Sequence, residues 1–311
     1  MDELPGGIKR VTMPLPTRPG HVHAYVLPSD DGWTVVDTGL GLPDAKERWA
    51  AELEGLPGRV ARVVVTHFHP DHVGAARDLA ELTGAPVAQG RLDYEQCALV
   101  WGGDDWSHVL VEWFRRHGAP PDVTNELVAQ GGFYRPFVRF QPDPELLEAG
   151  DRVDGWTVVA APGHADGQLM LLRDGVLVAA DHLLDRISPT VGLWPRSRPD
   201  PLGDYLDALE ATIALAPTLA IAGHGEPIDD PAARARDLLA HHRERLEATA
   251  AALNGAPRSA FTVSLVLFGD DLKPSARRFA VAESLSHLER LVREGGARRH
   301  EDVDSVAYTA G

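Results

Sequence analysis

The 311-residue chain contains a single cysteine, Cys97, so no disulfide can form within it. It has no run of about 18 apolar residues, which is the length that a membrane-spanning helix needs. Its first residues, MDELPGG, are acidic and rich in glycine and proline, unlike a signal peptide. Together these absences predict a cytoplasmic protein with no membrane partner. The length allows one large domain, or a large domain and a small one.

Positive charge is also scarce. The net charge is −16, and the only lysines are Lys9, Lys46 and Lys273. Residues 233–311 are nearly neutral, with 12 basic and 11 acidic residues, which leaves 18 basic and 35 acidic residues in 1–232. Because phosphate binding relies on lysine and arginine, this acidic body disfavours nucleic acid as a partner. A small-molecule substrate is the better expectation, and the sequence is compatible with a homo-oligomer.

Strand and helix patterns alternate between residues 20 and 90, which indicates an α/β arrangement. Apolar strands are expected at 23–29 and 32–39 around an Asp-Asp-Gly turn, then at 61–67 and 86–90, with helices at 44–56 and 71–84. Residues 91–146 differ, because they are rich in tryptophan and phenylalanine and are expected to form a helical insertion. Those aromatic side chains either pack the insertion onto the body or line a substrate entrance.

Strand patterns return after the insertion, at 154–164, 168–181 and 218–228, with a helix at 200–217. A long helix is then expected from Pro231 to about Gly255, and the chain ends in a further helix and a hairpin. This order is winged-helix-like. We therefore expect a catalytic domain over residues 1–230, with its insertion at about 91–146, and a small winged-helix-like domain over residues 231–311.

The stretch THFHPDHVG follows a Val-Val-Val strand and contains His67, His69, Asp71 and His72. Imidazole nitrogens and carboxylate oxygens are ligands that zinc, iron and manganese prefer. His67 and His69 can face one ion from the turn, and Asp71 and His72 can face a second where the helix begins. Isolated histidines are usually surface or core residues, but this spacing predicts a metal site.

Three further donors each end a strand-like run: His164 in VVAAPGH, Asp181 in VLVAAD and His224 in AIAGH. Side chains at strand ends meet along one edge of a sheet. The sequence therefore predicts that these three residues complete a site for two metals.

The motifs THFHPDHVG, APGHADG, AADHLL and AGHG, with VVDTG upstream, resemble those of the metallo-β-lactamase fold superfamily over about residues 8–230. The resemblance implies a four-layer αββα sandwich of the α+β class with metals at one edge. It implies that His67, His69 and His164 hold metal 1, that Asp71, His72 and His224 hold metal 2, and that Asp181 bridges them. An aspartate in the third motif is similar to the glyoxalase II-like branch, and AVAESLSHLERLVREGGARR resembles the C-terminal domain of lactamase-beta-2-like hydrolases.

Two residues outside the donor set have roles that the resemblance informs. Asp37 in VVDTG is implied to stand behind the metal loop and brace it, although an aspartate there could also cap a turn. His23 stands where the family usually has an asparagine-like residue, and we expect a structural or pocket-rim role for it. His182 is expected near the site because it adjoins Asp181.

The predicted activity is hydrolysis by a hydroxide that bridges two divalent metal ions, with Asp71 holding that hydroxide and accepting its proton. Zinc is the first expectation, and iron or manganese would suit the same donors. A small carboxylic ester, thioester or lactone is the expected substrate. One alternative is a metal-dependent ribonuclease or phosphodiesterase, with phosphate contacts from Arg277, Arg278, Arg298 and Arg299. The other is a non-catalytic metal-holding binding protein.

Overall fold

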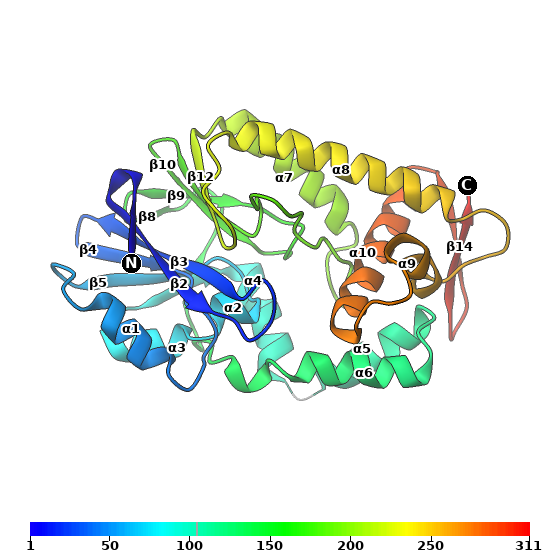
Figure 1. The fold of residues 1–311 in the computed structure, drawn as a ribbon, viewed down its shortest axis with the longest axis horizontal. Coiled ribbons are helices and arrows are strands. Elements are labelled where there is room, and N and C mark those ends of the chain that lie inside the picture. Colours follow the sequence, from blue (N-terminus) through cyan, green and yellow to red (C-terminus); the bar gives the residue numbers. More distant parts are fainter. Residues whose placement is uncertain (104) are drawn as a thin grey trace. The chain divides into compact units, whose positions relative to one another are not determined.

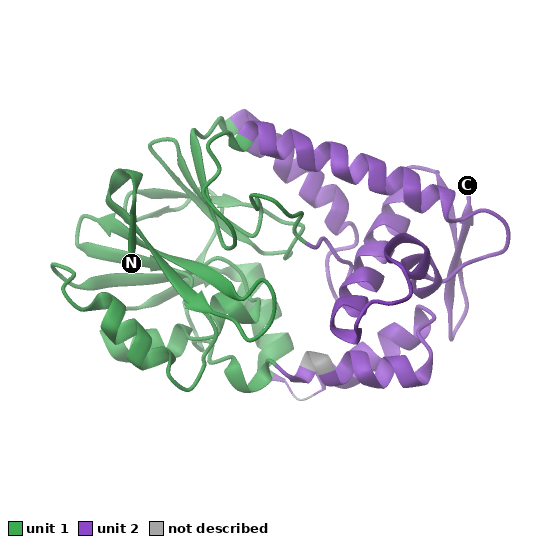
Figure 2. Cartoon of the chain, in the orientation of Figure 1, with its two compact units in different colours: residues 1–102, 134–189, 215–231 green, residues 103–133, 190–214, 232–311 purple. Residues whose placement is uncertain are grey.

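A computed structural model describes residues 1–103 and 105–311. The chain forms two compact units, and both are assembled from separated segments (Figure 2). Unit 1 contains residues 1–102, 134–189 and 215–231, and unit 2 contains residues 103–133, 190–214 and 232–311. The domain boundary that the sequence suggests at residue 230 stays a prediction. No sequence pattern indicated that two inner segments would group with the C-terminal residues.

A seven-stranded mixed sheet forms one layer of unit 1 (Figure 1). Its strands follow chain order: β1 (Asp2–Leu4), β2 (Ile8–Pro14), β3 (His21–Ser29), β4 (Gly32–Val36), β5 (Val60–Val65), β6 (Val87–Gly90) and β7 (Glu145–Leu147). Strands β1 to β4 pair antiparallel, whereas β4 to β7 pair parallel. The turn between β3 and β4 forms the predicted hairpin, and the parallel strands place their carboxyl ends at one edge.

The second sheet of unit 1 has five strands in the order β12-β11-β10-β9-β8. They are β8 (Arg152–Val153), β9 (Trp156–Ala160), β10 (Leu169–Arg173), β11 (Val176–Ala180) and β12 (Leu219–Ala222). All neighbours are antiparallel except β11 and β12, which are parallel. The strands predicted after the insertion are therefore confirmed.

Side-chain alternation divides the interior of unit 1 into two cores. Tyr25, Leu27 and Val64 of the seven-stranded sheet join Val158 and Leu171 of the five-stranded sheet in one buried cluster. The intervening residues of the first sheet point to its other face. There, Val26, Val63 and Val65 form a second cluster with side chains of the covering helices. A one-residue shift in any of these strands would exchange the two faces.

The helical segments of unit 1 are α1 (Ala45–Leu53), α2 (Pro70–Val73), α3 (Ala76–Thr83) and α4 (Arg91–Cys97), with short turns η1 (Pro5–Gly7), η2 (Ala98–Gly102) and η3 (Arg135–Phe137). The single helix predicted over 71–84 is wrong, because the structure divides it into α2 and α3. Ala75 precedes α3 with φ −103° and ψ 17°, outside helical geometry. The predicted cap at Gly84 is confirmed by its φ of +71°.

Unit 2 is mainly helical. Its elements are α5 (Trp106–Arg116), α6 (Pro121–Gly132), α7 (Pro201–Leu215), α8 (Pro231–Ala251), α9 (Ala260–Phe268), α10 (Pro274–Arg293) and the hairpin β13 (Ala297–Glu301) and β14 (Val306–Ala310). Phe114, Leu127, Val281, Leu288 and Tyr308 are members of one buried cluster. The aromatic residues Trp106 and Trp113 pack against that cluster. These two side chains therefore pack within unit 2, together with the C-terminal residues.

A pair of histidines lies in the interior of unit 2. His242 of α8 and His287 of α10 are both buried, and His242 Nδ1 lies 3.2 Å from His287 Nε2. His287 Nδ1 lies 2.8 Å from the carbonyl oxygen of Glu283, which can only accept, so Nδ1 carries the proton. In the neutral pair, His242 Nδ1 therefore donates to His287 Nε2.

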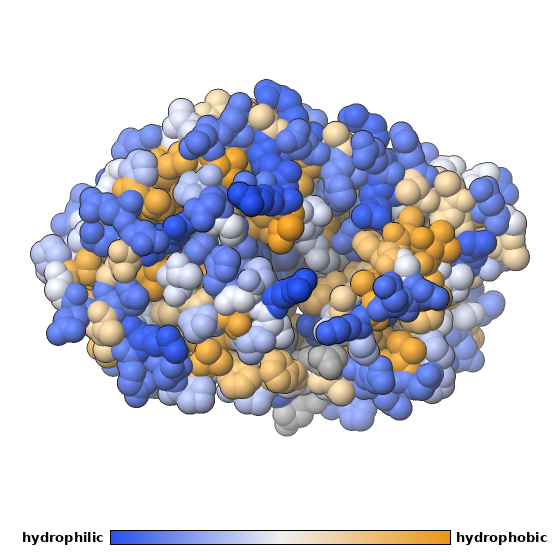
Figure 3. Space-filling model, viewed as in Figure 1, coloured by the Kyte–Doolittle hydropathy of each residue, from blue (hydrophilic) through white to orange (hydrophobic). Residues whose placement is uncertain are grey.

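Hydrophilic residues predominate on the face of the molecule shown in Figure 3, with smaller hydrophobic patches between them. Within residues 1–103 and 105–311, no helix is long and apolar enough to cross a membrane.

Candidate metal centre

The seven predicted donors all belong to unit 1, and each follows the end of a strand. Strand β5 ends at Val65 and leads into the turn that carries the first four donors. The other three, His164, Asp181 and His224, follow β9, β11 and β12. The donors follow strand ends, as predicted, but they come from both sheets and not from one edge of a single sheet.

The first donor group is His67, His69 and His164, each of which offers one nitrogen within 4.8 Å of the others. The rings of His67 and His69 lie 4.7 Å apart, and those of His69 and His164 lie 4.5 Å apart, both edge to face. Convergence of three imidazoles on one point is the arrangement that a tetrahedral metal with an open position requires.

The second group is Asp71, His72 and His224, whose ligand atoms also lie within 4.8 Å of one another. The Nε2 atom of His224 lies 3.4 Å from Asp71 Oδ2. His224 Nδ1 lies 2.8 Å from the carbonyl oxygen of His21, so Nδ1 donates and the Nε2 atom faces Asp71.

Asp181 lies between the two groups. Its Oδ2 atom is 3.5 Å from His164 Nε2 and 3.6 Å from His224 Nε2, which belong to different groups. Its Oδ1 atom is 3.5 Å from His72 Nε2. These separations are longer than those of good hydrogen bonds. A cation placed between an Asp181 oxygen and an imidazole nitrogen could contact both atoms. The geometry brings all seven predicted donors together.

The chemistry of the cluster fits metal cations. Among the residues that the structure describes, His67 Nε2 and Asp181 Oδ1 are buried without a hydrogen-bond partner. Such an arrangement is costly in a protein interior unless something else satisfies those atoms. Burial lowers the pKa of His67, and it lowers that of His69 to about 3, so both imidazoles are neutral and offer lone pairs. Nitrogen and carboxylate oxygen at this density are suitable for zinc, iron or manganese.

Asp37 stands behind the cluster and orients His72. Its Oδ2 atom accepts a hydrogen bond from His72 Nδ1 at 2.8 Å, which leaves the Nε2 atom of His72 directed at the other donors. Asp37 Oδ1 accepts from the backbone N–H of Thr66 at 2.8 Å. Burial would lower the pKa of His72, but the carboxylates of Asp181, Asp37 and Asp71 raise it above its ordinary value. The φ of +61° at Asp37 places a non-glycine residue in the left-handed region, at the end of β4.

Two residues at the site, Gly223 and Asp93, were not predicted from the sequence, and Trp101 was predicted only as one of the aromatic residues of the insertion. A Cβ atom at Gly223 would lie 2.3 Å from Asp181 Oδ1 and 2.8 Å from His72 Cε1, so only glycine fits there. Asp93 Oδ1 accepts from the N–H of Phe68, between two donors, and Trp101 Nε1 donates to the carbonyl of the same residue. The glycine before His224 was a visible signal. Asp93 had none, because it lies on α4, away from the motif.

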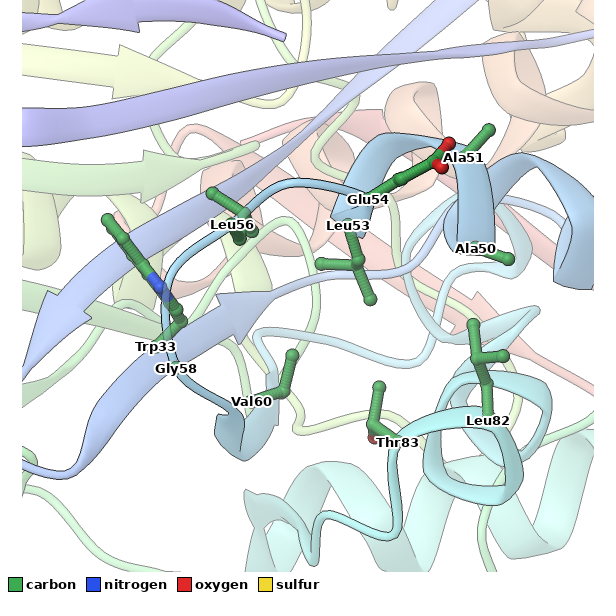
Figure 4. Close-up of a pocket in the computed structure, with 10 residues that line it drawn as sticks. All are labelled: Trp33, Ala50, Ala51, Leu53, Glu54, Leu56, Gly58, Val60, Leu82 and Thr83. Atoms are coloured by element: carbon green, nitrogen blue, oxygen red, sulfur yellow. The ribbon is translucent and has the colours of Figure 1, made fainter.

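A pocket lies elsewhere in unit 1, beside α1 and the end of α3 (Figure 4). It is lined mostly by apolar side chains, including Trp33, Leu53, Leu56 and Leu82, and its titratable lining residue is Glu54. None of the seven donors is among the described residues that line it. Because it lacks converging polar groups, the chemistry favours the donor cluster over this pocket as the active site.

The chain matches two family models. Residues 17–224 match the family described as the metallo-beta-lactamase superfamily. Residues 246–308 match the family described as the metallo-beta-lactamase-like C-terminal domain. The two matches account for the donor cluster and for most of the residues after it.

Relatives and solved structures agree with these matches. The chain is 28% identical to the "Probable metallo-hydrolase YqjP" of Bacillus subtilis (strain 168), over 96% of both chains. A metallo-beta-lactamase family protein of Thermus thermophilus is 34% identical, with a TM-score of 0.85 and 99% of each chain covered. A beta-lactamase domain protein of Burkholderia ambifaria is 29% identical, with a TM-score of 0.89, covering 100% of this chain and 94% of that one. These matches confirm the αββα fold predicted from the sequence.

Proposed function

This chain belongs to the metallo-beta-lactamase superfamily as a metal-dependent hydrolase, and on that premise we propose that its site is dinuclear. The observation that carries the proposal is the position of Asp181, which has one carboxylate oxygen near both donor groups. Two sets of neutral or anionic donors that share a carboxylate are typical of paired divalent cations.

The proposed ligands follow the geometry. His67, His69 and His164 hold the first cation, Asp71, His72 and His224 hold the second, and Asp181 contacts both. Asp37 orients His72 by accepting its Nδ1 proton. Zinc is the first choice of cation, with iron or manganese as alternatives, because these donors suit all three.

When bound, two divalent cations supply a water acidic enough to yield hydroxide near neutral pH, and positive charge beside the developing oxyanion. The chain's own contribution is to position that water and move its proton. Asp71 is the proposed catalytic residue, because its carboxylate lies at the edge of the cluster and is more exposed than those of Asp37 and Asp181. It orients the attacking water and accepts its proton.

We favour a small carboxylic ester, thioester or lactone as the substrate. The acidic charge of residues 1–232 disfavours polyanions. Two arginines that the sequence offered for phosphate contacts have other roles. Arg277 is buried and donates to the carbonyl oxygen of Ser264, and Arg299 forms ion pairs with Glu289 and Glu301. Arg277 is therefore not available to a phosphodiester backbone, which makes the nuclease alternative the weaker one.

Metal analysis tests the dinuclear site. We expect about two metal ions for each chain of the parent protein, and a loss of metal in His69→Ala and Asp181→Ala. Full occupancy in both variants would remove the ligand assignment. A panel of chromogenic esters, thioesters, lactones, β-lactams and phosphodiesters tests the substrate class. Cleavage of only the phosphodiester would favour the nuclease, and no turnover with both metals bound would favour a non-catalytic metal-holding protein.

A further inference from the structure

The loop that carries His224 follows a strand of the five-stranded sheet, but its hydrogen bonds are to the seven-stranded sheet. Strand β12 lies in the five-stranded sheet, but each residue from 222 to 226 is bonded to β2 or β3 of the seven-stranded sheet. These bonds are Tyr25 Oη to Ala222 O (2.6 Å), His23 N to Gly223 O (2.7 Å), His224 Nδ1 to His21 O (2.8 Å), His23 Nε2 to Gly225 O (3.1 Å) and Arg10 Nη1 to Glu226 Oε2 (2.9 Å).

The edge of β3 is open to these contacts because of its register. Strand β3 pairs with β2 from its first residue, His21, but its pairing with β4 starts only at Tyr25, opposite Val36. The N–H of His23 therefore has no partner in β4 and donates to the carbonyl oxygen of Gly223 instead. At the start of β3, the loop that carries His224 therefore occupies the place where a neighbouring strand would pair.

The His23 side chain adds a contact that the backbone cannot make. Its Nε2 atom faces the carbonyl oxygen of Gly225, which only accepts, so Nε2 carries the proton. The Nδ1 atom then accepts from the hydroxyl of Thr12 at 3.1 Å. Both ring nitrogens are engaged, and the residue is only 5% exposed. His23 is therefore not placed to be a metal ligand, in agreement with the structural role expected for it.

We propose that His23 is a positioning residue for His224, which it fixes by clamping the residues on both sides of it. His23 bonds to Gly223 through its backbone and to Gly225 through its ring, while the neighbouring His21 carbonyl sets the tautomer of His224. The outcome is that His224 Nε2 points at Asp71 and Asp181. This inference rests on the proposed dinuclear site. Because His224 is a proposed ligand of the second cation, the loss of His23 should affect binding of that cation and not of the first.

Zinc titration of the metal-free protein tests the proposal, with Zn²⁺ alone as the probe and calorimetry as the measurement. We expect two binding events in the parent. His23→Phe keeps a ring but cannot donate, and it should weaken one event by about 10- to 100-fold, the range for partners behind a ligand, while the other event stays within about 3-fold. His23→Gln, whose amide can donate to Gly225, should restore most of the lost affinity.

Thr34→Val is the matched control. It removes a buried hydroxyl on β4 of the same sheet. That hydroxyl donates to Asp154, which is not one of the seven proposed metal ligands. The variant should leave both events unchanged. Equal affinities in His23→Phe and the parent, or equal weakening of both events, would overturn the role of His23. A parent that binds fewer than two zinc ions would instead refute the dinuclear site, and with it the assignment of His23 to the second cation.

Tautomer measurement gives a second test that needs no variant to fold. Long-range proton–nitrogen correlation spectra of the parent should show His23 protonated at Nε2 and His224 protonated at Nδ1. Protonation of His23 at Nδ1 would break the bond to Gly225 and overturn the proposal.

Discussion

Mild acid should destabilise unit 2 through the buried pair His242 and His287. In the neutral pair, His242 Nδ1 donates to His287 Nε2 and His287 Nδ1 donates to the carbonyl of Glu283. His242 Nε2 is left buried with no hydrogen-bond partner among the residues that the structure describes. A proton entering there would find no acceptor, and Arg245 and His241 add positive charge that opposes it.

The direction and size of the effect follow from the pKa values. Burial is the main cause that lowers the pKa of His242 to about 3 and that of His287 to about 4, against an ordinary 6.5. The unfolded chain therefore binds more protons below pH 6.5, and stability is complete above that pH and falls as the pH drops toward the folded values. At pH 5, about 1.5 units below the unfolded pKa, one such histidine costs about 2 kcal/mol of unfolding free energy.

Urea unfolding at pH 7 and pH 5, followed by circular dichroism on metal-free protein, measures this cost. His242→Gln keeps a donor for His287 but does not titrate, so its loss of stability between the two pH values should be smaller than the parent's by about 2 kcal/mol. His300→Gln, on an exposed residue of β13, is the control and should lose as much as the parent. If all three proteins lose the same stability, the argument from the buried pair is wrong.

Three other predictions concern the donor cluster. Gly223→Ala places a methyl group 2.3 Å from Asp181 Oδ1, so we expect metal analysis to show loss of bound metal, whereas Gly55→Ala, where nothing lies within 4 Å, should keep its metal. Asp37→Asn removes the anionic acceptor of His72 Nδ1 and should weaken metal binding by about 10- to 100-fold in a chelator competition, an idea that equal affinities would contradict. Adding zinc at about 100 times its Kd to chelator-treated protein should stabilise it by about 2.7 kcal/mol in urea unfolding for each site that the ion fills, and an unchanged midpoint would mean that the folded state does not bind the ion.

Much of unit 1 could be predicted because its signals are local. Alternation in β3 and β5 sorts their side chains onto two faces, and donors that follow strand ends must meet where the strands of a sheet end together. His164, Asp181 and His224 were identified in this way, although they are far apart in the chain. Their roles as ligands remain predictions that metal analysis will decide.

The features that escaped prediction depend on contacts between distant segments. Periodicity cannot reveal that the helix after His72 breaks at Ala75, because the break depends on how the turn packs. Nor can it reveal that Arg277, in a basic stretch that looked suited to phosphate, is buried against Ser264. The partners of His23 and Asp93 are similarly invisible, since each lies on another element.

The bond between His21 and His224 joins residues 203 positions apart, and it has a consequence for folding. Closing so long a loop costs conformational entropy, and the bond joins β3 of the seven-stranded sheet to the loop that follows β12 of the five-stranded sheet. The first donor turn is complete by residue 72, but the last donor arrives with residue 224. We therefore expect the donor cluster to be completed only when the two sheets of unit 1 pack together, so that metal binding during refolding would follow that step.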